Sequence, residues 1–331
     1  MVYAGIDVHR KRSQVSLVDG DGKELLNRNV DNGSDAMLEI LEDLEPGTPV
    51  ALEAAYGWGW LADLLEESEL EAHLVHPSAC KAIASARLKN DKVDARMLAH
   101  LLRTDLLPEA WIAPKEVRDL RVLLRHRASL VRVRTSLKNR IHAVLADEGL
   151  KVEGEKLWSD EGQQWLAAAR VRDMHRLVVD DCCGMLDALA IPIKRLEADI
   201  HRLAKADPRV EALCDLPGVG VLTAMTLVSE IGDIKRFPTA RKLCAWAGLT
   251  PSVRNSDTKV RHGHITKAGP ASVRWVLTEA SYHARRFPPF AATFEAMTKR
   301  RGKHIAGVAL SRKLLARSFH ILKSLEAAKT Q

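Results

Sequence analysis

The order of apolar and polar positions in the first hundred residues predicts a sheet combined with helices. Three strand-like segments come first, Tyr3–Asp7, Ser13–Val18 and Lys23–Val30, and the turn residues 19–22 precede the last of them. The pattern then alternates between helix and strand, over Ala36–Leu44, Pro49–Ala54, Trp58–Glu67, Ala72–Val75 and Lys81–Leu102. Three strands followed by alternating helices and strands indicate an α/β layer.

A long amphipathic helix is predicted next, over Glu116–Glu148, because apolar residues recur at a spacing near 3.5 to 3.6. Its other faces are strongly basic, with Arg118, Arg121, Arg125, Arg127, Arg132, Arg134, Lys138 and Arg140. A second helical stretch, Arg172–Lys205, can pair with it as an antiparallel coiled coil or bundle. The basic faces have two interpretations, a solvated surface or an arm that contacts nucleic acid or a second subunit.

The remainder, from about Glu211, predicts a mostly helical domain. Leu216–Ala224 contains two closely spaced glycines, and an apolar helix follows to Ile231. Further segments read as a helix over Ala240–Ala247, a polar, basic loop over Thr250–Gly269, and helices over Ala271–Ala284 and Ile305–Ala327. We therefore divide the chain into an α/β domain over residues 1–110, a helical arm over 111–207 and a mostly helical domain over 208–331.

Composition narrows the class of protein. With 331 residues the chain exceeds the ~250 at which single cores stop growing. Fifty Lys and Arg against 43 Asp and Glu give a net charge of +7, which favours a polyanionic partner if the excess lies on one face.

No apolar run approaches the ~20 residues of a membrane span, and the N-terminus does not resemble a signal peptide, so we expect a cytoplasmic location. Five cysteines without a C-x-x-C pair argue against a disulfide framework or a zinc site.

Four acidic residues in the N-terminal layer are candidates for chemistry. Asp7 ends the first apolar strand, Glu53 lies inside another, and Asp91 and Asp94 are three apart, which places both on one face of a helix. A carboxylate within an apolar strand is costly unless it is paired or bound to a cation. Mg²⁺ prefers oxygen ligands, and a pair of such ions can hold the attacking and leaving oxygens of a phosphodiester.

Each acid also has an ordinary structural interpretation. Asp7 could end a strand at a turn, Glu53 could be a salt-bridge partner, and Asp91 and Asp94 could cap a helix. Their joint order strengthens the catalytic interpretation, because the strand order matches a ribonuclease-H-like sheet, whose centre brings such positions together. Strand order alone would also permit other mixed sheets.

The glycine-containing turn and the basic loop are the other candidates. Gly218 and Gly220 permit a tight turn of the helix-hairpin-helix kind, whose N–H groups can face a phosphate; the alternative is a tight turn between helices with no ligand. In the loop, Ser252 and Ser256 could cap turns or act as a nucleophile. The neighbouring cations Arg254, Lys259, Arg261 and Lys267 would stabilise a phosphorane-like transition state. Chemistry alone does not choose between the two serines.

Several motifs in sequence order resemble the IS110 family of insertion-sequence transposases over nearly the whole chain. The motifs are Gly5-Ile6-Asp7-Val8-His9, Leu52-Glu53-Ala54, Lys89-Asn90-Asp91-Lys92-Val93-Asp94-Ala95, Leu216-Pro217-Gly218-Val219-Gly220, Gly248-Leu249-Thr250-Pro251 and Ile265-Thr266-Lys267-Ala268-Gly269. The resemblance implies a RuvC-like DEDD domain, a central coiled coil and a C-terminal transposase domain with a serine nucleophile.

The resemblance also implies roles for particular residues and partners. Asp7, Glu53, Asp91 and Asp94 match the acids that bind Mg²⁺, and Ser256 matches the serine that forms a covalent phosphoserine with DNA. Asp257 stands where the family commonly has glycine, so Ser252 remains the second candidate. The implied partners are target and donor DNA, a structured bridge RNA that pairs with both, and further copies of the chain in a dimer or tetramer. In that oligomer Ser256 of one subunit would meet the carboxylates of another.

These observations lead to one expected function and two alternatives. We expect a Mg²⁺-dependent, RNA-guided DNA recombinase in which the basic helix contacts phosphates through Arg118, Arg121, Arg125, Arg132 and Arg134. The first alternative is a metal-dependent nuclease or junction resolvase that hydrolyses DNA without a covalent intermediate. The second is a non-catalytic protein that binds nucleic acid through the basic helix and the glycine turn.

Overall fold

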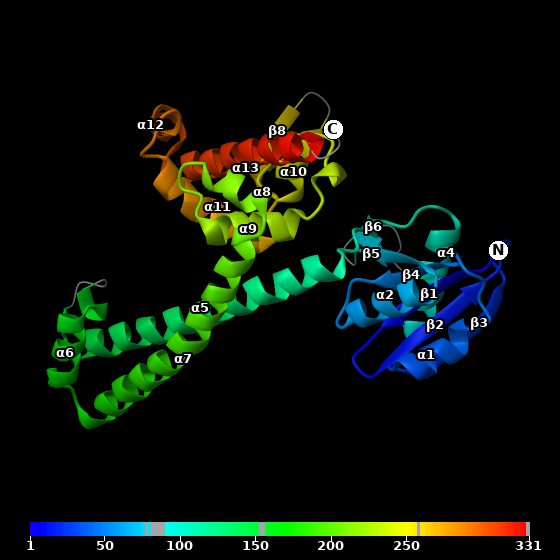
Figure 1. Cartoon of the computed structure of the whole chain (residues 1–331), viewed down its shortest axis with the longest axis horizontal. Coiled ribbons are helices and arrows are strands. Elements are labelled where there is room, and N and C mark those ends of the chain that lie inside the picture. Colours follow the sequence, from blue (N-terminus) through cyan, green and yellow to red (C-terminus); the bar gives the residue numbers. More distant parts are fainter. Residues whose placement is uncertain (77–78, 81–89, 152–155, 257–258, 329–331) are drawn as a thin grey trace. The chain divides into compact units, whose positions relative to one another are not determined.

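The computed structural model describes residues 1–76, 79–80, 90–151, 156–256 and 259–328, without the side chains of residues 254–256, 259–260 and 262. The chain divides into two compact units, Met1–Ala113 and Pro114–Gln331 (Figure 1). None of the helices formed by the described residues has the length and apolar character that a membrane span requires. All five cysteines are free thiols. The division into three domains at residues 110 and 207 stays a prediction.

The first unit is built on a six-stranded mixed sheet with the order β3-β2-β1-β4-β5-β6. Its strands are β1 (Tyr3–Val8), β2 (Arg12–Val18), β3 (Glu24–Asp31), β4 (Pro49–Glu53), β5 (Glu71–Val75) and β6 (Glu109–Ala110). The first three form an antiparallel meander, whereas β4 pairs in parallel with both β1 and β5. The predicted α/β layer is therefore confirmed, and the short edge strand β6 is an addition to it.

Helices cover both faces of the sheet in this unit. Side chains alternate along each strand, so each face presents its own set of residues to a helix. Ala4, Ile6 and Val8 of β1 point to the core shared with α1 (Ser34–Leu41) and α2 (Trp58–Glu67). The opposite face carries α4 (Asp91–Arg103), whose Leu98 packs in a second core cluster with Ala51 of β4. Of the helical segment predicted over Lys81–Leu102, residues 81–89 lie outside the described part of the chain.

The second unit begins with two long helices, α5 (Lys115–Asp147) and α7 (Asp173–Lys205), that pack side by side (Figure 1). Their direction is antiparallel, since Arg127 pairs with Glu197 while Glu148, at the end of α5, pairs with Arg172 and His175. The connection contains η1 (Lys156–Trp158) and α6 (Asp160–Ala168), which the apolar pattern did not predict. Packing of the two predicted long helices is confirmed.

The rest of this unit packs around one large core. Its elements are α8 (Pro208–Cys214), α9 (Val221–Ile231), η2 (Ile234–Arg236), α10 (Ala240–Trp246), β7 (Pro251–Ser256), β8 (Lys259–Ile265), α11 (Ala271–Ala284), α12 (Phe290–Arg301) and α13 (Lys303–Ala328). Leu124 of α5 belongs to the same core, together with residues of α9, α11 and α13. Side chains from α5 thus join the helical arm to the bundle that follows it.

The loop predicted over Thr250–Gly269 is wrong, because most of it forms the antiparallel hairpin of β7 and β8. Val253, Val260 and Ile265 are β-branched residues that favour a strand, but the polar residues between them hide the alternation. A second difference is α12, which starts directly after Pro288 and Pro289 and was not predicted. Pro289 is the N-cap residue of this helix, so the two prolines mark the boundary before it.

Candidate functional site

Asp7 lies at the end of β1, on the sheet face that α4 covers. Strand β1 pairs in parallel with β4 in a register that sets Gly5 opposite Ala51. Asp7 and Glu53 are each two residues further along, so they share this face at neighbouring strand ends. The Asp7 side chain is only 6% exposed. The sheet therefore holds one carboxylate buried and a second close beside it.

Helix α4 brings two more acids to the same place. A Cβ on Gly5 would lie 2.1 Å from the Ala95 carbonyl oxygen and 2.5 Å from the Ala99 nitrogen. No side chain fits there, so glycine is what allows α4 to lie directly on β1. The helix begins at Asp91, with the Asn90 side chain accepting a hydrogen bond from the Val93 N–H at 2.9 Å. Asp91 and Asp94 occupy its first turn, where the helix dipole favours negative charge.

His9 completes this cluster, although no role was predicted for it. Its Nε2 lies 3.2 Å from Asp7 Oδ2 and 3.1 Å from Asp91 Oδ1. The signal that could have found it is the Asp-x-His spacing at the end of a buried strand, because the chain can return the imidazole to the preceding carboxylate. The structure thus joins β1, the turn after it and α4 through one side chain.

Burial and several neighbouring acids together set the electrostatics of this cluster, and burial is the larger influence on the pKa of Asp7. Burial raises the pKa of Asp7 to about 6, with His9 opposing the shift and Glu53, Asp94 and Asp91 adding to it. Burial disfavours the charged form of His9, but the negative charges of Asp7, Asp91 and Glu53 outweigh it and raise the pKa of His9. A bound cation would favour the charged form of Asp7, against both its burial and the charges of the neighbouring acids.

The donor set fits a divalent cation. Asp7, His9 and Asp91 each offer one ligand atom, and these atoms lie within 4.8 Å of one another. Glu53 and Asp94 influence the pKa of Asp7 through their charge but are not members of that group. Of the four predicted metal-binding acids, the structure brings Asp7 and Asp91 to one point and places Glu53 and Asp94 around it.

The predicted serine region forms a hairpin. The backbone of Ser256 ends β7 and pairs with Lys259 of β8, while Asp257 lies outside the described residues. The side chains of Arg254, Ser256 and Lys259 are likewise outside the described part. A Cβ on Gly263 would lie 2.4 Å from Ser252 Oγ, so the Ser252 hydroxyl covers the opposite strand. Two of the predicted cations, Arg261 and Lys267, are exposed.

The two glycines of the predicted helix-hairpin-helix turn differ in their surroundings. Gly218 has a φ of 81°, and a Cβ there would lie 2.4 Å from the Ala280 carbonyl oxygen of α11. Gly220 precedes α9, and a Cβ there would meet no atom within 4 Å. Gly218 is therefore required for packing, and the N-terminus of α9 at Gly220 is the open part of the turn.

The arginines of α5 also separate into two groups. Arg121 donates to the carbonyl oxygens of Ser229 and Glu230, and Arg125 donates to both carboxylate oxygens of Glu230. These contacts anchor α5 to α9. Arg132 lies on the exposed side of the helix, while Arg118 and Arg134 are half-buried. The predicted phosphate contacts therefore rest mainly on the arginines outside the Glu230 contact.

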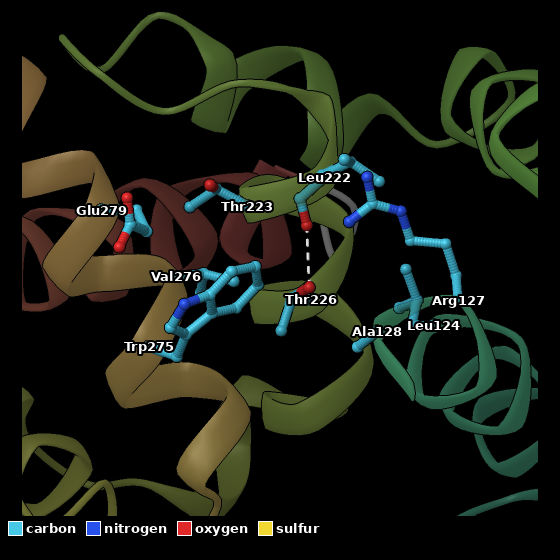
Figure 2. A pocket seen from close by; sticks show the side chains of 9 residues that line it. All are labelled: Leu124, Arg127, Ala128, Leu222, Thr223, Thr226, Trp275, Val276 and Glu279. Atoms are coloured by element: carbon cyan, nitrogen blue, oxygen red, sulfur yellow. Dashed lines mark hydrogen bonds between the residues drawn. The ribbon is translucent and has the colours of Figure 1, made fainter. Parts of the chain in front are cut away.

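A pocket of about 180 Å³ lies where α5, α9 and α11 meet (Figure 2). It is lined by Leu124, Arg127, Ala128, Leu222, Thr223, Thr226, Trp275, Val276 and Glu279. Two of its polar side chains are already engaged, since the Thr226 hydroxyl donates to the Leu222 carbonyl and Arg127 pairs with Glu197. The residues predicted to carry chemistry do not line this pocket.

Comparison with known proteins finds transposases over most of the chain. Residues 4–148 match the DEDD family model of IS110, described as "Transposase", and residues 210–295 match the model described as "Transposase IS116/IS110/IS902 family". The transposase for insertion sequence element IS1111A of Coxiella burnetii is 27% identical over 317 residues, covering 93% of this chain and 86% of that protein.

Two further relatives carry insertion-element names. The transposase for insertion sequence element IS1328 of Yersinia enterocolitica is 22% identical, covering 84% of this chain and 82% of its own length. The insertion element IS110 43.6 kDa protein of Streptomyces coelicolor is 32% identical over 127 residues, which is 38% of this chain and 31% of that protein. The first family match contains all four predicted metal-binding acids, and the second contains the hairpin with Ser252 and Ser256.

Proposed function

Because this chain belongs to the IS110 family of insertion-sequence transposases, enzymes that cut and rejoin DNA, we propose that it works through a divalent-metal site at Asp7 and a serine nucleophile at Ser256. The observation that carries the proposal is the convergence of Asp7, His9 and Asp91 on one point, with the nearby charges of Glu53 and Asp94. A buried carboxylate with a raised pKa in such surroundings is typical of a functional site.

The topology supports a RuvC-like, ribonuclease-H-like assignment for the first unit. An antiparallel meander of β3, β2 and β1 continues into the parallel strands β4 and β5. In this arrangement the ends of β1 and β4 lie side by side beneath the start of α4. The three elements therefore supply Asp7, Glu53 and the pair Asp91 and Asp94, the order expected for a DEDD site.

These acids would hold Mg²⁺, which when bound stabilises negative charge on the attacking and leaving oxygens of a phosphodiester. The protein supplies the rest. Asp7 is fixed by the sheet and Asp91 by the capped start of α4, so the ligands are positioned before any cation binds. The exposed sides of Asp91 and His9 leave the cluster open to DNA.

We assign the covalent step to Ser256. Its Oγ forms a bond to phosphorus as the bond from phosphorus to the leaving strand oxygen breaks, and the hydroxyl proton ends on that oxygen. The free hydroxyl of another strand then attacks the phosphoserine and restores the serine, which rejoins DNA. Arg254, Lys259, Arg261 and Lys267 are the cations of this region that would stabilise charge on the phosphate.

The resemblance to the IS110 family is the basis of the partners that we propose. A bridge RNA would pair with target and donor DNA, so that base pairing carries sequence specificity while the protein holds backbones. The α9 N-terminus at Gly220 and the exposed arginines of α5 are the candidate backbone contacts. Oligomerisation would bring Ser256 of one subunit to the carboxylates of another, in the cytoplasm where the element's DNA lies.

The test is to trap the covalent protein–DNA adduct with the purified chain, its bridge RNA and the element's DNA. We expect wild type and Ser252→Ala to form the adduct and Ser256→Ala to form none while still binding RNA and DNA. Asp7→Asn should also form none. An adduct that survives in Ser256→Ala and disappears in Ser252→Ala would assign the nucleophile to Ser252. Cutting without any adduct would instead establish the metal-dependent nuclease.

A further inference from the structure

The environment of His9 indicates a role beyond the four acids. Its Nε2 is 3.2 Å from Asp7 Oδ2 and 3.1 Å from Asp91 Oδ1. Adjacent ligand atoms around an octahedral ion with bonds of ~2.1 Å are separated by about 3.0 Å. The imidazole nitrogen therefore has the spacing of a neighbouring ligand to each carboxylate oxygen, and all three atoms lie within 4.8 Å of one another.

The backbone around His9 holds the imidazole in this place. The His9 N–H donates to the Arg12 carbonyl at 3.2 Å, and the Asn32 side chain donates to the His9 carbonyl at 2.7 Å. The Ser13 hydroxyl in turn donates to Asn32 Oδ1 at 2.7 Å, which fixes the amide. The turn after β1 is thus tied to the end of β3, and the ring reaches back to Asp7 from a constrained backbone.

The solvent exposure of His9 allows an ion that enters from solution to reach its side chain. The His9 side chain is 49% exposed and that of Asp91 is 55% exposed, whereas Asp7 is buried. A cation approaching from solvent therefore meets His9 and Asp91 first, with Asp7 behind them.

We infer that His9 is a further protein ligand of the proposed metal site and makes it a mixed nitrogen and oxygen site that binds Mn²⁺ more tightly than Mg²⁺. The inference rests on the proposed function, because it presumes a cation at Asp7 and Asp91. Imidazole suits transition metals, while Mg²⁺ is bound by carboxylates, carbonyls and water. Carboxylates alone would discriminate less between the two ions.

The opposite role for His9 is that of an internal positive charge which occupies the ion's place. An imidazolium between two carboxylates would satisfy them in the absence of metal and compete with it. The two roles predict changes of opposite sign when the imidazole is removed, so a binding measurement separates them.

The experiment measures Mn²⁺ binding to the untagged full chain by electron paramagnetic resonance and Mg²⁺ binding by competition. His9→Ala should weaken Mn²⁺ binding by about 10- to 100-fold and Mg²⁺ binding by less than about threefold, the size of effect seen when a group that supports a metal is lost. Pulsed spectra of bound Mn²⁺ should show coupling to an imidazole nitrogen in wild type and lose it in His9→Ala. His100→Ala, a matched histidine on α4 outside the ligand group, should change neither result.

Several outcomes would overturn the inference. Unchanged relative affinity for the two ions and unchanged nitrogen coupling in His9→Ala would exclude His9 as a ligand while leaving the metal site intact. Tighter binding of both ions by His9→Ala would identify His9 as the internal charge. Wild-type affinity for both ions in Asp7→Asn would show that the proposed metal site itself is wrong.

Discussion

Asp7 of the first unit and Glu230 of the second are both buried acids, each 4% exposed, yet their surroundings are opposite. Glu230 of α9 accepts hydrogen bonds from Arg125 at 3.0 Å on both carboxylate oxygens and from the Ser272 hydroxyl at 2.9 Å, with Arg121 3.8 Å away. Asp7 has His9 beside it, but three further carboxylates also raise its pKa. The protein neutralises one of these acids and leaves the other with excess negative charge.

The difference shows what makes a buried carboxylate functional. Burial alone does not, because Glu230 is as buried as Asp7 and its contacts hold three helices together. An acid whose nearest neighbours include other acids costs folding energy, and such a cost is retained where an external cation can offset it. The charges around each acid, more than its depth, therefore distinguish a structural position from a candidate site.

The largest expected effect is on recombination. Asp7→Asn, Glu53→Gln and Asp91→Asn should each reduce it by on the order of 1,000-fold or more, because groups that hold a metal act as a unit. RNA and DNA binding should persist, and Asp43→Asn, an exposed acid at the end of α1, should behave as wild type. The measurement is a recombination assay with purified protein, and near-normal activity in any of the three variants would contradict the metal-site assignment.

The same comparison predicts a loss of stability at the structural acid. Glu230→Gln should lower the free energy of unfolding by about 3 kcal/mol, because it leaves Arg121 and Arg125 without their carboxylate partner. Amide hydrogen exchange of α9 should increase, whereas Mn²⁺ binding should be unchanged. Exchange equal to that of wild type would mean that the Arg–Glu contacts contribute little.

Removing the charge of Asp7 should have the opposite effect and raise the free energy of unfolding. Asp7→Asn should stabilise the metal-free protein by about 3 kcal/mol at pH 7.5, since the folded-state pKa of Asp7 is raised from 3.8 to about 6 and each pKa unit corresponds to about 1.4 kcal/mol. Above pH 6 the wild type bears the full cost of a buried charge. As the pH falls from 6 to 3.8 the folded wild type binds a proton and recovers this stability.

The advantage of Asp7→Asn should therefore shrink to about half at pH 5. Thermal unfolding in the presence of a chelator, at pH 7.5 and pH 5, measures both values. An advantage that does not change between these pH values would show that the carboxylate charge is not its cause.

Much of the fold could be predicted from periodicity. The helix over Trp58–Glu67 and the one over Ala271–Ala284 were predicted with the bounds that the structure gives them, because each has a continuous apolar stripe. The hairpin over Pro251–Ile265 was missed because its strands are mostly polar, and Val253, one of its described apolar side chains, is exposed instead of packed against a core. Local pattern is informative only where one face of an element packs against a core.

The candidate site was predictable in part for a similar reason. Acids in or beside apolar strands stand out in the sequence, so Asp7 and Glu53 could be found there. For His9 the Asp-x-His spacing is only a hint, because its role depends on the turn that returns its ring to Asp7 and on the packing of α4 over Gly5. Nor could sequence show that Arg125 pairs with Glu230, a residue 105 positions away.

The smallest expected effect concerns the arginines of α5. As with the two buried acids, a charge that already has a partner within the protein should behave differently from one that has none there. Arg132→Gln together with Arg134→Gln should reduce the slope of log affinity against log salt by about 0.9 per lost phosphate contact on duplex DNA. Arg125→Gln should change the slope by much less, since its guanidinium is already bound to Glu230, and should instead reduce stability. Titrations of random-sequence duplex at several salt concentrations measure the slopes.

Equal slopes for wild type and the Arg132 and Arg134 double variant would mean that this face of α5 is solvated. A large change in Arg125→Gln would mean that DNA displaces Glu230 from its arginine.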